Sequence, residues 1–95
     1  MRQGSENRIR AMSHPTRAAI LRILAERTAS PVEMARELEE ELSNVSYHAK
    51  QLVHFECAEL VGIRPVRGAL EHFYRATERH LIDAETPLLL ERQGL

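Results

Sequence analysis

The spacing of apolar side chains predicts three helices in the first half of the chain. A segment opened by His14-Pro15 has an apolar stripe broad enough for burial on two sides, made of Ala18, Ile20, Leu21, Ile23, Leu24 and Ala25. Pro15 lies in its first turn, where the missing N–H costs nothing. The sequence SPVE at residues 30–33 is a capping box, and Val32, Ala35 and Leu38 follow at helical spacing. We therefore expect a short second helix of about three turns after the first.

A third helix is expected after a turn rich in glutamate. Ser43 can cap it, and it should run to about Cys57. Its apolar face consists of Val45, Ala49, Leu52 and Val53. The opposite face carries Asn44, Tyr47, His48 and Gln51. This side of the helix carries both hydrogen-bond donors and acceptors, whereas an ordinary solvated face would carry mainly Glu and Lys.

Two runs that favour β-structure follow the third helix. LVGIRPV at residues 60–66 and ALEHFYRAT at residues 69–77 flank Arg67-Gly68, which predicts a hairpin with a tight, cationic tip. Pro65 cannot donate to a ladder and should face an unpaired edge. Helix, turn, helix and hairpin is the order of a winged helix-turn-helix. We expect a mainly α fold with a small β-hairpin wing, as one domain over residues 1–95 with residues 78–95 as a C-terminal tail for dimerisation.

Composition limits the possible classes of protein. A chain of 95 residues with 43% hydrophobic content fits one small domain, and domains of this size often gain stability by pairing with a copy. The single cysteine excludes an internal disulfide framework and most cysteine-based metal sites. The N-terminus does not look like a signal peptide, and no apolar run approaches the length of a membrane span, so we expect a cytoplasmic protein without a membrane partner.

Charge is segregated along the chain. The net charge of −1 conceals balances of +4 over residues 1–27, −4 over residues 28–42, +1 over residues 43–76 and −2 over the remainder. A surface can be locally basic while the whole molecule is nearly neutral, so composition neither establishes nor excludes phosphate binding.

Three blocks of sequence resemble the ArsR-type winged helix-turn-helix regulators. They are MSHPTR with AILRIL at residues 12–24, VSYHAKQL at residues 45–52 and RGALEHFYRA at residues 67–76. The resemblance implies a dimeric transcriptional repressor whose helix from Ser43 to about Phe55 enters the major groove of double-stranded DNA, at a palindromic operator, while the wing touches the flanking backbone. Because the segment from Pro31 to Leu38 lacks the cysteines of the thiolate sites, the chain looks closest to the branch without metal ligands.

Residue chemistry independently indicates which side chains contact DNA. Asn44 and Gln51 present a donor beside an acceptor, which matches the adenine edge in the major groove. Single hydrogen bonds to bases or phosphates are expected from Ser43, Ser46, Tyr47, His48 and Lys50. The expected wing contacts are Arg64, Arg67 and Gly68, and a further phosphate contact is expected from Thr16 and Arg17. Alternatives exist: Tyr47 can pack on the preceding helix, His48 can close the turn, and Arg17 and Arg67 can be plain surface charges.

The acidic run Glu37 to Glu41 supports a rival hypothesis. It would repel a duplex if it faced one, which would suit a winged-helix module that binds a protein partner and not DNA. This rival gains if Glu39 to Glu41 lie beside Tyr47 and Gln51.

The remaining patterns concern self-association, metal binding and catalysis. A dimer should use Ile9 and Met12 together with four residues of the tail, Leu81, Ile82, Leu88 and Leu89. His80 and Asp83 are the only residues of the tail that suit the family's other metal site, so no metal or other cofactor is expected. No arrangement of nucleophile and base indicates an enzyme. Cys57 should be buried. Glu56 stands near the helix end, where the ArsR-type regulators usually have glycine, so we expect the connection into the hairpin to lack a left-handed glycine cap. The effector cannot be read from the sequence.

Overall fold

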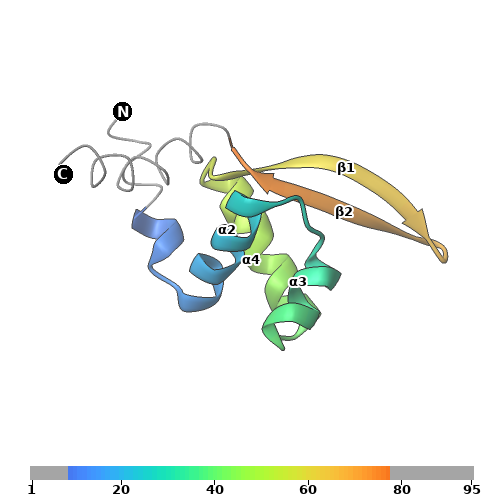
Figure 1. Cartoon of the computed structure of the whole chain (residues 1–95), viewed down its shortest axis with the longest axis horizontal. Helices are drawn as coiled ribbons and strands as arrows, with labels where there is room; N and C mark the ends of the chain where they lie inside the picture. The colour runs from blue at the N-terminus through green and yellow to red at the C-terminus, as the bar shows by residue number, and fades with distance from the viewer. Residues whose placement is uncertain (1–8, 78–95) are drawn as a thin grey trace.

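The computed structural model describes residues 9–77, which form helices followed by an antiparallel hairpin (Figure 1). A helical turn at residues 9–12 is followed by α2 (Pro15–Glu26), α3 (Pro31–Leu38) and α4 (Leu42–His54). The hairpin consists of β1 (Ala58–Val66) and β2 (Ala69–Ala76), and it projects away from the helices. The predicted winged helix-turn-helix, mainly α with a β-hairpin wing, is confirmed.

The capping box at the start of α3 is present. The backbone N–H of Ser30 donates to Glu33 Oε1 at 2.9 Å, and the N–H of Glu33 donates to Ser30 Oγ at 3.2 Å. Ser30 also has a role beyond the cap, because its buried hydroxyl donates to Glu71 Oε2 on β2 at 2.6 Å. The start of the second helix is therefore linked directly to the wing.

The expected cap of α4 was wrong by two residues. Glu41 and not Ser43 is the N-cap, no side chain caps the helix, and the carbonyl of Glu41 accepts the first intrahelical bond from Val45. The reason is the end of α3, where Glu39 adopts a left-handed conformation with φ of 55° and turns the chain into α4 within three residues.

The end of α4 also differs from the expectation. The helix stops at His54 because Glu56 adopts a left-handed conformation with φ of 61°. The N–H groups of Glu56 and Cys57 then donate to the carbonyls of Val53 and Leu52, both at 2.9 Å, which is the bond pattern of a Schellman motif. We expected the absence of glycine to remove this left-handed ending; instead, a glutamate adopts it.

The core lies where the three helices meet the inner end of the hairpin (Figure 1). Its large, fully buried side chains are Ile20, Leu21 and Leu24 of α2, Met34 of α3, and Val45 and Leu52 of α4. Cys57 is buried, as expected. Tyr74 also connects the layers, because it pairs with Ala29 through two backbone hydrogen bonds of 2.9 and 3.0 Å. This bridge attaches β2 to the segment between α2 and α3.

The hairpin closes through a two-residue turn. Val66 pairs with Ala69, and the intervening Arg67 and Gly68 have φ of 49° and 79°. Positive φ at both central residues defines the type I′ geometry, whose twist matches that of the strands. Pro65 pairs with Leu70 in the two-stranded sheet of the described residues, and the outer edge of β2 is paired only at Tyr74, through its bridge to Ala29.

Some predictions concern residues that the structure does not describe. The tail residues Leu81, Ile82, Leu88 and Leu89 lie outside residues 9–77, as do His80 and Asp83. Within residues 9–77, no helix has both the length and the apolar content required to cross a membrane.

Candidate nucleic-acid interface

The outward face of α4 carries most of the polar side chains predicted to contact DNA. Val45, His48, Ala49 and Leu52 point into the protein. Ser43 and Lys50 are exposed, and the side chain of Tyr47 is 56% exposed. Asn44, Ser46 and Gln51 are half-buried. Amides, hydroxyls and one ammonium group thus line the accessible side of this helix.

The predicted placement of His48 on this exposed face was wrong. Its side chain is only 4% exposed, because it lies beside Val45 and Leu52 on the buried stripe of the helix. The imidazole packs against the ring of His14 at a centroid distance of 4.2 Å, and its Nδ1 has no hydrogen-bond partner among the described residues. Burial, the first cause, and the charges of His14 and Arg17 hold the pKa of His48 below its ordinary value.

Thr16 and Arg17 are occupied by contacts within the protein. Arg17 donates to the carbonyls of Ala11 and Arg10 at 3.2 and 2.7 Å, and its guanidinium lies 5.3 Å from the centre of the Phe55 ring. These bonds satisfy carbonyls at the end of the first helical turn, which accounts for an arginine at this position. Thr16 donates to Glu40 at 3.2 Å. Neither residue is part of the interface that we propose below.

The acidic run lies at the start of α4 and not along its exposed face. Glu40 accepts a hydrogen bond from Asn44 at 3.4 Å, whereas Gln51 lies ten residues beyond Glu41, which is about 15 Å along a helix. Glu39 to Glu41 therefore do not lie beside Gln51. The carboxylate of Glu40 is, however, close to one predicted base-reading side chain.

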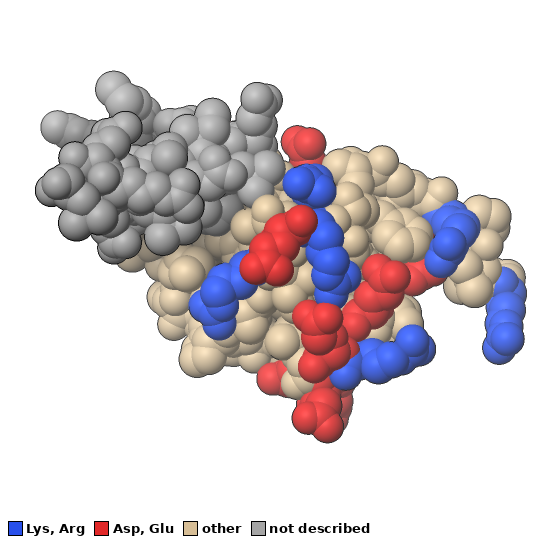
Figure 2. Space-filling view, viewed as in Figure 1, with Lys and Arg blue, Asp and Glu red and all other residues tan. Residues whose placement is uncertain are grey.

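The two arginines of the wing have different surroundings. Arg64 forms an ion pair with Glu71 at 3.0 Å, and its guanidinium lies 5.1 Å from the centre of the Phe73 ring. Arg67, at the tip, has no ion pair among residues 9–77. Figure 2 shows basic side chains toward the end of the hairpin, while acidic and basic groups alternate over the helices. The tip offers an uncompensated positive charge far from the acidic run.

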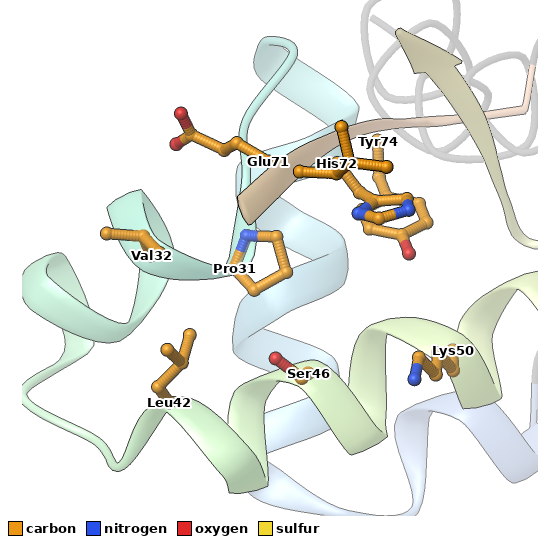
Figure 3. A pocket seen from close by; sticks show the side chains of 9 residues that line it. Pro31, Val32, Leu42, Ser46, Lys50, Glu71, His72 and Tyr74 are labelled. Atoms are coloured by element: carbon orange, nitrogen blue, oxygen red, sulfur yellow. The ribbon is translucent and has the colours of Figure 1, made fainter. Parts of the chain in front are cut away.

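One feature was missed by the sequence reasoning, a groove of about 260 Å³ between α4, the start of α3 and β2 (Figure 3). Leu70, His72 and Tyr74 line it from β2, and Ser46 and Lys50 line it from α4. The alternation of side chains along a strand places residues 70, 72 and 74 on one face, which the sequence indicates, but the sequence gives no signal that α4 lies opposite that face.

No group of three or more His, Cys, Asp or Glu side chains in residues 9–77 is arranged to hold a metal ion.

Comparisons with known proteins support the class of fold. Residues 12–54 match the family model described as "Helix-turn-helix domain". Among curated proteins, no significant sequence match was found. The chain is therefore a winged helix-turn-helix protein.

Several solved structures of other proteins share this fold. HlyU from Vibrio cholerae is 23% identical, with 95% of this chain and 90% of that chain covered and a TM-score of 0.68. The homodimeric DNA-binding domain of Mb0332 from Mycobacterium bovis, a possible ArsR-family transcriptional regulator, is 16% identical, with 95% and 79% covered and a TM-score of 0.68. The transcriptional regulator HlyU from Vibrio vulnificus is 20% identical, with 90% and 85% covered and a TM-score of 0.66. The resemblance to ArsR-type regulators is confirmed in the fold.

Proposed function

We propose that this protein is a sequence-specific DNA-binding transcriptional regulator of the ArsR type. The observation that carries the proposal is the outward face of α4, where amides, hydroxyls and Lys50 are accessible and no carboxylate lies between Ser43 and Gln51. A helix with this face fits the major groove, in which base edges present donors and acceptors. The uncompensated charge of Arg67 suits a flanking phosphate or the minor groove.

Individual roles follow from the positions along α4. Asn44 and Gln51 are separated by seven residues, or about 10 Å of helix rise, which corresponds to about three base-pair steps. We assign these two amides to base edges. The remaining contacts on α4 are assigned to Ser43, Ser46, Tyr47 and Lys50, and those on the wing to Arg67 and Gly68. Arg64 orients the wing through Glu71 and is a weaker candidate for a phosphate contact.

We further propose a homodimer that represses transcription in the cytoplasm by occupying a palindromic operator. The support is the exposure of Ile9 and Met12, at 70% and 47%, together with the apolar tail residues at positions 81, 82, 88 and 89. The homodimeric state named for Mb0332 is consistent with this arrangement. Two copies of α4 would then read half-sites about one helical turn of DNA apart. Sedimentation as a monomer at micromolar concentration would contradict the dimer.

The DNA-binding proposal is tested by selecting bound fragments from random duplexes and measuring affinity for the selected duplex against salt. Gln51→Ala should weaken binding by about 1–3 kcal/mol and relax the preference at one base position. Arg67→Asn keeps a residue suited to the type I′ turn and should reduce the salt slope by about 1 without altering the selected sequence.

Arg22→Gln is the matched control, because it removes an exposed charge from α2 and should change neither property. A wild-type protein that binds no duplex at low ionic strength, or binds without salt dependence, would contradict the proposal. The position of Glu40 beside Asn44 would then favour the alternative, a winged-helix module that binds another protein.

A further inference from the structure

The groove between β2, the start of α3 and α4 has the size of a binding site for a small molecule. Its volume of about 260 Å³ lies slightly below the roughly 300–1,000 Å³ of pockets for drug-sized ligands. The groove is therefore suited to a metabolite or fragment and is too small for a folded partner segment.

The two ends of the groove differ in chemistry (Figure 3). Pro31, Val32 and Leu42 form an apolar end, and both Val32 and Leu42 are more than 40% exposed. At the opposite end Lys50 lies on α4, while His72 and Tyr74 extend from β2 toward it. A ligand that matches this arrangement has an apolar body at one end and a polar group at the other.

The charge available in the groove is positive. Lys50 has no ion pair among the described residues. Glu71 also lines the groove, but its carboxylate is directed away from Lys50 in Figure 3 and is held by Ser30 and Arg64 at 2.6 and 3.0 Å. These two hydrogen bonds lower the pKa of Glu71. Its charge is thus already compensated, and that of Lys50 is not.

We propose that this groove binds a small amphipathic carboxylate, with the carboxylate at Lys50 and the apolar body against Pro31 and Leu42. Ser46 and His72 can donate further hydrogen bonds to the carboxylate. A phosphodiester of DNA also suits Lys50, but it would leave the apolar end uncovered, so a carboxylate with an apolar body fits the whole groove better.

The consequence for regulation rests on the proposed function. Ser46 and Lys50 belong both to the groove and to the face of α4 assigned to DNA. A carboxylate bound at Lys50 would neutralise its charge and cover Ser46. The ligand would therefore compete with DNA, and the groove would act as the site of an effector.

Lys50 is the only lysine in the sequence, which permits a direct test. Reductive methylation with isotope-labelled methyl groups keeps its positive charge and gives one side-chain amine signal, distinguishable from that of the N-terminus by its pH dependence. Phenylacetate should shift the Lys50 signal saturably, with a dissociation constant of about 1 mM. The neutral 2-phenylethanol and inorganic phosphate should each bind at least about tenfold more weakly, since each lacks one half of the match.

Two variants and a control test the site. Lys50→Met removes the charge but keeps the aliphatic part of the side chain, and it should weaken phenylacetate binding about tenfold. Leu70→Gln removes apolar surface from the exposed wall of the groove and should also weaken binding. Binding to both variants is followed through the backbone amide signals of β2. Arg22→Gln should leave it unchanged. No saturable shift up to about 10 mM phenylacetate, equal binding of phosphate, or unchanged binding in Lys50→Met would overturn the proposal.

Competition with the selected duplex is measured separately. Phenylacetate should weaken duplex binding of the wild type and not that of Lys50→Met. Failure of the protein to bind any duplex, with phenylacetate binding intact, refutes only the DNA-binding function. Binding of the duplex without competition by bound phenylacetate refutes the regulatory consequence and leaves the ligand site standing.

Discussion

At the scale of single residues, three residues other than glycine adopt the left-handed backbone conformation that usually favours glycine. Glu39, Glu56 and Arg67 have φ of 55°, 61° and 49°, and they end α3, end α4 and form the tip of the wing. Each costs conformational energy that the surrounding hydrogen bonds offset. These three positions allow the chain to change direction before α4, after α4 and at the tip of the wing.

Glu56→Gly should stabilise the protein. Glycine adopts the left-handed conformation without strain, and this gain exceeds the cost of the larger conformational entropy of the unfolded chain by about 0.5–1 kcal/mol. The free energy of unfolding in urea, or an increase of about 2–8 °C in Tm, measures the effect. Glu56→Ala is the control, because it removes the carboxylate and keeps the strain. Equal stability of the two variants would show that the backbone conformation is not responsible.

His48 makes stability depend on pH. Because its pKa is lowered in the folded state, the unfolded chain binds a proton more readily, and the free energy of unfolding decreases as pH falls below the ordinary value of 6.5. Burial and the charges of His14 and Arg17 cause this, and Glu40 opposes it in part. Tm should therefore fall between about pH 7.5 and 5.5, and His48→Gln should reduce the fall. His54→Gln, at an exposed position of α4, should retain the wild-type dependence.

The sequence predicted the structural roles of some residues correctly and of others wrongly, for physical reasons. The Ser30 capping box is a local interaction across three positions, so its spacing was sufficient. His48 is a polar residue, and its burial depends on tertiary packing that brings the ring of His14 against it, which the sequence does not signal. The cap at Ser43 failed because the left-handed Glu39 determines where α4 begins, and glutamate gives no signal for that conformation.

At the scale of secondary-structure elements, the wing is joined to the helices by two connections. One is the backbone pairing of Ala29 with Tyr74. The other is a chain of side chains in which the buried hydroxyl of Ser30 and the guanidinium of Arg64 both donate to Glu71. Since Arg64 lies on β1 and Glu71 on β2, this chain couples both strands to the start of α3.

A double-mutant cycle should reveal that coupling. Ser30→Ala removes the cap and the link together and should cost about 1–2 kcal/mol of unfolding free energy, whereas Glu71→Gln should cost less. The double variant should be more stable than the sum predicts, by about 0.5 kcal/mol or more, because both changes disrupt one interaction. Glu59→Gln, on the exposed part of β1, is the control partner. Additive effects of Ser30→Ala and Glu71→Gln would contradict the link.

The order of elements could be read from the sequence because caps, apolar spacing and the Arg67-Gly68 turn are local signals. The groove could not, since Leu42, Ser46 and Lys50 face β2 only after the hairpin has packed on the helices. The contact from Ser30 to Glu71 spans 41 positions and was likewise invisible.

At the scale of the whole molecule, the weak net charge of −1 makes local charge decisive for any polyanionic partner. The acidic run precedes α4, where negative charge stabilises the positive end of the helix dipole. The same charge lies next to Asn44, where it would repel an approaching phosphate. The negative charge of Glu40 therefore stabilises α4 but weakens binding to DNA.

Glu40→Gln should consequently tighten DNA binding. The amide can still accept the hydrogen bond from Thr16, while the removal of one negative charge near the duplex should gain about 1 kcal/mol, or about fivefold in affinity. The gain should shrink as salt rises from about 0.05 to 0.3 M, because exposed charges are screened over about 10 Å or less. Glu26→Gln, at the far end of α2, changes the net charge equally and should gain much less. An equal gain from both variants would mean that total charge, and not the position of Glu40 beside α4, controls the affinity.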